Sequence, residues 1–398
     1  MGLKGGVLRV FTSVTLMWFV VCGVFISSCK STTNNSENLL KNSISGYCDI
    51  VFATYSDAYS SALELQSATN LLVTEPSEAN LEKAKTAWRS AREVYGKTEV
   101  FRFYDGPIDN GSTGVEGLLN AWPLDEIYVD YVVGNENAGI INNITEYPTI
   151  TKELLKSMNE NGGEENISTG FHAIEFLLWG QDLDSVGPGK RPFTDYLAET
   201  KNADRRKIYL STAVELLIEN LSYLKSEWEP GITNNYRAAF INDNPENSLQ
   251  KIITGIAVLS KVEMAGERMF TAYDNSNQED EQSCFSDNTR SDLIFNLGGI
   301  INIFYGTYLR NDKTTLEVTG IDEIIKNKNT KLFEETDSLI QKSMNDLQQI
   351  YYPFDRAIVL EEKRPQVMKA VLSMQELGEQ FAKVAAELGL TININVVE

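Results

Sequence analysis

The sequence is poor in the residues on which several common enzyme sites depend. It contains one histidine, His172, four cysteines and ten prolines in 398 residues. Zinc peptidases of the H-E-x-x-H and H-x-x-E-H types need two histidines, so the single imidazole excludes both. No G-x-S-x-G nucleophile motif is present, and Gly189-Lys190 lacks the glycine spacing of a phosphate-binding loop. These absences leave few established catalytic motifs for the chain.

Basic residues are also scarce relative to acidic ones. The chain has 35 Lys and Arg against 56 Asp and Glu, a net charge of −21 at pH 7. A surface of this sign repels nucleic acid and anionic polysaccharide over a Debye length of about 8 Å at physiological salt. We therefore expect a cation or a small ligand as the partner, and no nucleic acid.

The first 28 residues have the pattern of an export signal. Lys4 and Arg9 are followed by a mostly apolar, uncharged run from 10 to 26. These 17 residues fall short of the roughly 20 needed to cross a bilayer, which favours a signal peptide over a membrane-spanning helix. Ile26-Ser27-Ser28-Cys29 resembles the lipobox at which bacterial lipoproteins are cleaved and acylated. We predict lipidation at Cys29, an outer-membrane lipoprotein facing the periplasm or the cell exterior, and a flexible tether over 29–45.

Two cysteines remain after the predicted cleavage and acylation, Cys48 and Cys284. In an oxidising cell envelope they could form one disulfide. Two free thiols fit the sequence equally well, so both alternatives stay open.

Helical spacing of apolar residues dominates the rest of the chain, and no run of alternating strand residues is present. Thr74-Glu75-Pro76 opens a predicted helix over 81–95. Five further amphipathic stretches follow, at 204–228, 248–273, 288–308, 334–349 and 366–388. We predict an all-α protein with an N-terminal bundle over 46–195 and a C-terminal bundle over 196–398. The long segments between helices, at 104–120, 134–143, 159–166 and 181–192, are expected to supply the walls of a site.

The helix that contains His172 is short and apolar on almost every face. Ser168 or Thr169 can cap its start and Gly180 can end it, which predicts a buried helix over 170–179. His172 and Glu175 share one face because they are three residues apart. A buried carboxylate costs several kcal/mol unless it is paired. Glu175 is therefore predicted to meet a metal ion, an arginine or lysine, or charged His172, unless the pair forms a structural hydrogen-bond network.

Several motifs along the chain resemble the imelysin family of bacterial envelope proteins. The motifs are W-x-x-A-R-x-x-Y-x-x-T-E-V-F-R-F at 88–103, G-P-I-D at 106–109, N-A-W-P-L-D-E at 120–126, G-x-H-x-x-E at 170–175, W-G-Q-D-L at 179–183, M-A-G-E-R at 264–268 and S-C-F-S-D-N-T at 283–289. The resemblance covers most of the mature chain. It implies an all-helical fold of two bundles, with the H-x-x-E residues near their junction. Members of the family have been described as metallopeptidases, and relatives are tied to iron uptake.

The expected site combines this resemblance with the chemistry of the side chains. His172, Glu175 and Glu99 are the predicted metal ligands. One imidazole with carboxylates suits iron better than tightly held zinc, and zinc or no metal are the alternatives. Further residues of the same motifs are expected to orient these ligands or to line the site: Arg92, Arg102, Trp88, Asp182, Ser286 and Asp287. Gln282 and Arg290 depart from the family pattern, because many members have histidine there.

Three functions follow from these expectations. The first is a lipid-anchored envelope protein that binds iron and serves iron uptake together with partner proteins. The second is a metallopeptidase of the imelysin type, with Glu175 as the general base. The third is a protein that binds a small ligand or a partner without metal.

Overall fold

The computed structural model describes residues 2, 11–111, 113–184 and 186–394. Within helix α1 (Phe11–Thr74) the side chains are described from Ser36 onward. The predicted signal peptide and the Cys29 side chain therefore lie outside the side chains that are described. Among the described residues, no helix combines the length and the apolar character needed to cross a membrane.

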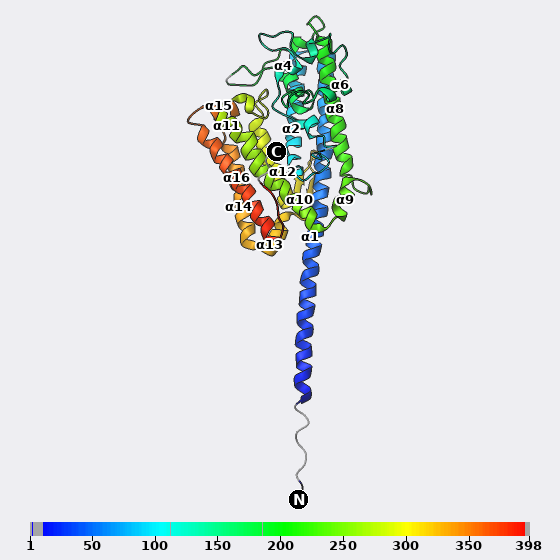
Figure 1. Cartoon of the computed structure of the whole chain (residues 1–398), viewed down its shortest axis with the longest axis vertical. Coiled ribbons are helices and arrows are strands. Elements are labelled where there is room, and N and C mark those ends of the chain that lie inside the picture. The colour runs from blue at the N-terminus through cyan, green and yellow to red at the C-terminus, as the bar shows by residue number, and fades with distance from the viewer. Residues whose placement is uncertain (1, 3–10, 112, 185, 395–398) are drawn as a thin grey trace.

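One group of helices comes from the first part of the chain, and the long helix α1 runs along its length (Figure 1). Packed with α1 are α2 (Glu78–Gly96) and α8 (Ala203–Glu227), and α7 (Gly170–Trp179) packs against α2 and α8. Shorter elements connect them: η1 (Glu99–Phe101), α3 (Glu116–Asn120), α4 (Glu126–Val129), α5 (Gly139–Asn142), α6 (Lys152–Met158), η2 (Phe193–Tyr196) and α9 (Tyr236–Asn242).

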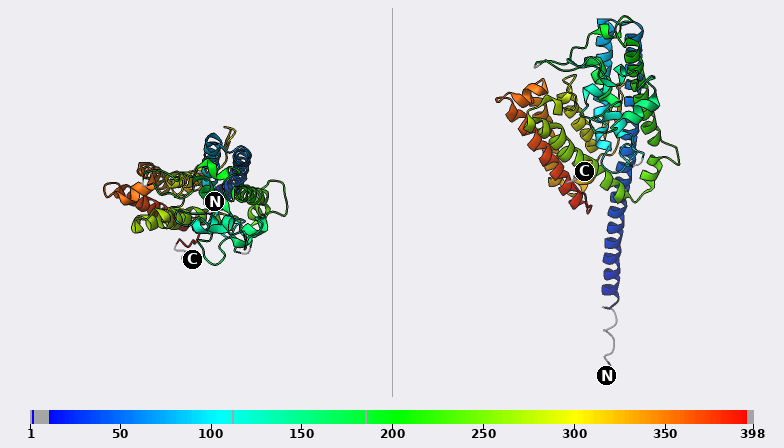
Figure 2. Two further views of the ribbon diagram at one scale, coloured as in Figure 1. Left: turned by 90° about the horizontal axis from the view of Figure 1, so that it is seen from above. Right: turned by 45° about the horizontal axis from the view of Figure 1, so that its top comes forward.

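The second group comes from the C-terminal part of the chain and lies beside the first in every view (Figures 1 and 2). Its long helices are α10 (Pro245–Val258), the π-helix η3 (Leu259–Thr271), α12 (Thr289–Tyr305), α14 (Thr330–Gln349) and α16 (Arg364–Glu387). Short helices complete it: α11 (Ala272–Asn275), η4 (Gln278–Asp280), α13 (Ile321–Lys328) and α15 (Phe354–Val359). Strands β1 (Thr307–Leu309) and β2 (Thr315–Glu317) form an antiparallel hairpin with Tyr308 opposite Leu316.

The predicted all-α fold of two bundles is confirmed, and each predicted helix overlaps an observed one. The predicted start at Thr74 is wrong, because Thr74 ends α1 and Ser77 caps α2, and the predicted helix 288–308 ends at Tyr305. Two details of the predicted organisation differ from the observed arrangement. The segment 29–45 is helical within α1, where Ser43 and Ile44 are buried, because Leu40, Ile44 and Tyr47 form an apolar face with helical spacing. Helix α8 packs with α1 and α7, whereas the predicted boundary at 195/196 assigns it to the second bundle.

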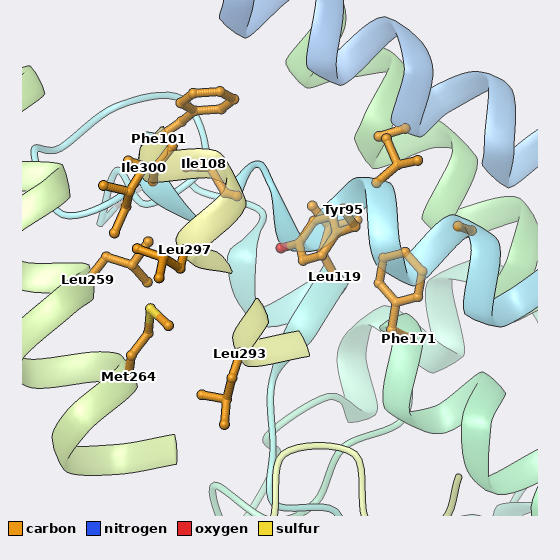
Figure 3. Close-up of a cluster of buried hydrophobic side chains, with 14 of the residues drawn as sticks. Tyr95, Phe101, Ile108, Leu119, Phe171, Leu259, Met264, Leu293, Leu297 and Ile300 are labelled. Carbon is orange, nitrogen blue, oxygen red and sulfur yellow. The ribbon is translucent and has the colours of Figure 1, made fainter. Parts of the chain in front are cut away.

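A continuous hydrophobic core joins the two groups of helices. In Figure 3, Leu297 and Ile300 of α12 and Leu259 of η3 lie beside Phe101 and Ile108 of the first bundle. The same cluster includes Leu293 of α12, Met264 of η3, and Tyr95, Leu119 and Phe171 of the first bundle. Gly299 of α12 permits this packing, because a Cβ atom there would lie 2.4 Å from the Lys97 carbonyl oxygen. The close approach positions η1, and therefore Glu99, between the two bundles.

Cys48 and Cys284 are free thiols. Cys48 is fully buried and Cys284 is half-buried, and no disulfide joins them. Of the two alternatives that the sequence left open, the structure shows the pair of thiols.

Candidate functional site

The G-x-H-x-x-E segment forms α7, and every one of its ten residues is buried. Gly180 ends the helix, as predicted, and Thr169 occupies the N-cap position. The Thr169 side chain makes no capping hydrogen bond, because its hydroxyl donates to Asn159 Oδ1 at 3.0 Å instead. Gly170 starts the helix with a φ of +79°, and a Cβ atom there would lie 2.5 Å from the Leu119 carbonyl oxygen. Both the backbone conformation and the close contact require glycine at this position. The glycine of the motif thus fixes α7 against α3.

His172 and Glu175 form a hydrogen-bonded pair on one face of α7. His172 Nδ1 lies 2.8 Å from Glu175 Oε2. The other carboxylate oxygen, Oε1, accepts hydrogen bonds from the Ser286 backbone N–H at 2.9 Å and from the Ser286 hydroxyl at 2.6 Å. No residue in the described part of the chain bonds His172 Nε2, and the side chain is 2% exposed.

Burial decides the charge of both groups. It raises the pKa of Glu175 to about 7, although the bonds from Ser286 and the nearby Arg92 act in the opposite direction. Burial, aided by Arg92, lowers the pKa of His172 well below its ordinary value, so the imidazole is neutral at pH 7. Of the predicted partners of Glu175, neither an arginine or lysine nor a charged His172 pairs with it among the described residues. The pair instead takes part in a hydrogen-bond network in which Ser286 supplies neutral donors.

Arg92 of α2 connects the first bundle to the second. Its Nε donates to Asp292 Oδ1 of α12 at 3.0 Å, and its Nη1 donates to Asn120 Oδ1. Asp292 also accepts from the Ser283 hydroxyl at 2.6 Å and from Asn288 Nδ2 at 3.0 Å. Both members of this ion pair are fully buried. Arg92 therefore has a fixed position beside α7.

Glu99 shares the partner Asn120 with Arg92, but it is bound mainly by two other arginines. Its Oε2 accepts from Arg268 Nη2 at 2.5 Å and from Arg102 Nη1 at 3.1 Å, and its Oε1 accepts from Asn120 Nδ2 at 3.3 Å. Burial alone would raise its pKa, but Arg268 and Arg102 lower that pKa to about 2. Glu99 is thus a carboxylate that guanidinium groups already neutralise.

The π-helix explains how Arg268 can reach this cluster. In η3 the residues five positions apart share a face, and Arg268 Nε donates to Glu263 Oε1 at 3.0 Å. Nη1 of the same guanidinium donates to Asn296 Oδ1 of α12 at 2.8 Å. π-helical turns are rare and are frequent at functional sites. Here the π-helix brings Glu263 and Arg268 to the bundle junction.

The other predicted site residues lie around α7. Trp88 Nε1 donates to the Phe171 carbonyl at 3.0 Å and packs edge-on against Trp179 at 5.2 Å, so Trp88 holds α7 in place. Asp182 and Asp287 are buried, and burial with repulsion between carboxyl groups raises their pKa values to about 6 and about 7.

Several polar residues around the pair were not predicted. They are Asn120, Glu263, Glu281, Asp292, Asn296 and Asp355, together with Arg268 as the partner of Glu99. Arg268 is part of a motif that the sequence analysis quoted, M-A-G-E-R, whereas nothing in their sequence context marked Asp292 or Asn296. Gln282, one of the two departures from the family pattern, is 2% exposed, and its side-chain amide has no hydrogen-bond partner among the described residues.

The predicted ligand set is only partly brought together. His172 and Glu175 are in contact, while the oxygens of Glu99 are taken by Arg268, Arg102 and Asn120. Within the described ranges, no group of three or more His, Cys, Asp or Glu side chains is arranged to hold a metal ion. The site therefore lacks the closed ligand set of a structural metal centre.

Comparisons with known proteins agree with the fold and the motifs. A family model described as Imelysin, which is also labelled as a peptidase, matches residues 51–384. A protein named iron-regulated protein A, from Synechococcus elongatus (strain ATCC 33912 / PCC 7942 / FACHB-805), is 26% identical over 285 residues, or 71% of this chain and 69% of that protein.

A solved structure has the same fold. It is described as an iron-regulated protein A precursor from Parabacteroides distasonis ATCC 8503, with a TM-score of 0.69 at 18% sequence identity. The match covers 88% of this chain and 95% of that one.

Proposed function

Because the chain belongs to the imelysin family, we propose that it is a lipid-anchored envelope protein that binds iron as cargo during iron acquisition. The H-x-x-E pair at the bundle junction is the proposed binding site, and Cys29 is the proposed point of attachment to the outer membrane. The name of the similar protein, iron-regulated protein A, supports the connection with iron.

The state of His172 is the observation that carries this proposal. The imidazole is neutral and buried, and when Glu175 is ionised the Nδ1–H donates to it, which leaves a lone pair on Nε2. Nε2 has no partner among the described residues. Histidines that bind metal commonly donate their second ring N–H to a carboxylate in this way. We therefore assign Nε2 of His172 as the nitrogen ligand and Glu175 as the group that orients the ring.

A site with few protein ligands is suited to a metal ion that the protein carries and then releases. A protein that must release iron has no need of the four protein ligands that hold a structural metal. The proposed site offers an imidazole nitrogen and no thiolate, which suits iron better than a thiolate-preferring ion, and zinc is the alternative metal. Glu99 has no place in this ligand set, because two guanidinium groups neutralise it.

Metal analysis of protein purified without a polyhistidine tag tests the assignment. After loading with iron and desalting, we expect about one iron per wild-type chain and at least tenfold less in His172→Ala. Glu126→Gln is the matched control, because burial also raises the pKa of Glu126 to about 7, yet its partner is Gln181. Equal iron in wild type and His172→Ala, or none in the wild type, would contradict the proposal.

A metallopeptidase is the second candidate function. The pKa of Glu175, about 7, is the value expected of a general base that works near neutral pH. This function predicts chelator-sensitive cleavage of a peptide library that Glu175→Gln abolishes. Cleavage that continues in Glu175→Gln would exclude this role for the residue.

A further inference from the structure

A cavity of about 440 Å³ lies on the first bundle, next to the segment that follows α7. Its walls come from that segment, between Gly180 and Pro192, and from Tyr131 and Val133 of the loop after α4. None of the H-x-x-E residues lines it. The volume is within the range of about 300 to 1,000 Å³ that is typical of small-molecule sites.

Hydrogen bonds between the two walls give the cavity a fixed shape. The Val133 backbone N–H donates to Gln181 Oε1 at 2.7 Å, and Gln181 Nε2 donates to Glu126 Oε2 at 2.6 Å. The Arg191 backbone N–H donates to the Trp179 carbonyl at 2.7 Å. The protein's own hydrogen bonds therefore hold the walls of the cavity in place.

Arg191 contributes a guanidinium group that two carboxylates hold in a fixed position at the cavity. Its Nη1 donates to Asp130 at 2.8 Å and to Asp195 at 3.0 Å, and its guanidinium carbon lies 5.2 Å from the ring centroids of both Tyr131 and Phe176. The side chain is 2% exposed, and its Nε has no hydrogen-bond partner in the described part of the chain. An N–H donor that is buried without a partner favours a ligand with an acceptor oxygen.

Lys190 adds a second positive group at the cavity. Its Nζ pairs with Asp184, which also lines the cavity, and the lysine side chain is 74% exposed. An ammonium group has three N–H donors, so Lys190 can bond a further oxygen while it keeps Asp184 as a partner.

The apolar part of the cavity lies at its rim. Val133 and Leu183 are 75% and 70% exposed, the two highest exposed fractions among the exposed large hydrophobic residues of the described chain. Isolated exposed apolar residues are common in proteins, but these two line one cavity next to two cationic side chains. This combination matches a molecule with an anionic head and an apolar body.

We infer that this cavity binds a small carboxylate attached to an apolar group. The carboxylate accepts hydrogen bonds from Arg191 and Lys190, and the apolar group packs against Val133 and Leu183. The same chemistry is offered by a free carboxylic acid and by the C-terminus of a peptide that ends in an apolar residue. The inference is independent of iron binding, because the cavity and the H-x-x-E pair share no residue.

Calorimetric titration of the full chain with four probes tests the inference. The probes are hexanoate, its neutral amide, and an N-acetylated alanyl-leucine dipeptide with a free or an amidated C-terminus. We expect the acids to bind at least tenfold more tightly than their amides. Whichever acid binds more tightly identifies the source of the carboxylate. Amides that bind as tightly as the acids, or no binding of either acid up to about 10 mM, would overturn the inference.

Variants at the rim locate the binding. Val133→Asp should weaken acid binding at least tenfold, and Lys190→Gln at least threefold. Val186→Asp is the matched control, because Val186 is 65% exposed on the same segment but does not line the cavity. It should leave binding within twofold of wild type. Equal weakening by Val186→Asp would show a general charge effect and refute the assignment to this cavity. Unchanged circular dichroism spectra verify that each variant is folded.

Discussion

At the scale of single residues, the H-x-x-E pair shows how a carboxyl group can occupy a helical interior without a positive partner. Ser286 supplies two donors to one carboxylate oxygen and His172 contacts the other. Burial raises the pKa of Glu175 to about 7, so near pH 7 both the protonated and the ionised form of this carboxyl group are populated. A carboxyl in this state can respond to a cation, because binding one favours ionisation.

The same residue should make the stability of the metal-free protein depend on pH. The pKa of Glu175 is about 7 in the folded protein against an ordinary value of 4.5, so the folded state binds more protons between these values. The free energy of unfolding therefore decreases as pH rises through that window. At 1.36 kcal/mol for each pKa unit, the change is about 3 kcal/mol. Glu175→Gln should lose this part of the pH dependence.

Urea unfolding of chelator-treated protein at pH 5 and pH 8 measures the effect. The exposed Asp312→Asn serves as the control and should retain the wild-type pH dependence, because Asp312 is exposed and, among the described residues, its hydrogen bonds come from Thr314. If Glu175→Gln lost stability between the two pH values as steeply as wild type, the raised pKa would be wrong.

The residues of the pair could be predicted from the sequence, but their surroundings could not. Spacing of three residues in an apolar helix was enough to place His172 beside Glu175. Ser286 is 111 residues away from Glu175, and Arg268 is 169 residues away from Glu99. Helical periodicity specifies which side chains share a face of one helix. It contains no information on which distant segment packs over that face.

At the scale of single elements, α12 contains two adjacent glycines that should respond in opposite ways to alanine. A Cβ atom at Gly298 meets nothing within 4 Å, so Gly298→Ala should raise the free energy of unfolding by roughly 0.5–1 kcal/mol. A Cβ atom at Gly299 would lie 2.4 Å from the Lys97 carbonyl oxygen. Gly299→Ala should therefore lower the free energy of unfolding by about 1–3 kcal/mol.

Chemical denaturation of both variants against wild type measures the two effects. Each substitution is the control for the other, because helix propensity changes equally at the two positions. Two shifts of the same sign would mean that α12 does not approach Lys97 as closely as the structure shows.

The positions of the helices could be predicted from the sequence, but whether a helix is an α-helix or a π-helix could not. The apolar pattern at 248–273 predicted a helix, and the chain is helical there, but its second half is the π-helix η3. Residues spaced by three and four in an apolar pattern do not distinguish an α-helix from a π-helix. The i, i+5 contact between Glu263 and Arg268 is therefore visible only in the structure.

At the scale of the whole molecule, the junction of the two bundles is partly apolar and partly ionic. The core residues of Figure 3 pack across it, and Arg92–Asp292 and Glu99–Arg268 are buried ion pairs that join the first bundle to the second. Two bundles held together in this way should unfold as one cooperative unit. The sequence predicted the two bundles, but it did not predict the ion pairs that connect them.

Removing one charge from this junction should be costly for the entire protein. Glu99→Gln removes a buried carboxylate from Arg268 and Arg102, which keep Glu263 and Glu116 as partners. The loss of stability should therefore lie near the lower end of the cost of breaking a buried pair, at about 3 kcal/mol. Glu376→Gln is the matched control, because its partner Lys342 lies 2.6 Å away on the exposed surface of α14. An exposed pair of this kind contributes less than about 1 kcal/mol.

Urea denaturation, followed by both tryptophan fluorescence and circular dichroism, measures the loss in each variant. We expect a single coincident transition in wild type, because the two bundles share one core, and a much earlier transition in Glu99→Gln than in Glu376→Gln. If Glu99→Gln were no less stable than Glu376→Gln, Glu99 would not be neutralised by Arg268 and Arg102. Its carboxylate would then be available as a metal ligand, and the iron content of Glu99→Gln would fall together with that of His172→Ala.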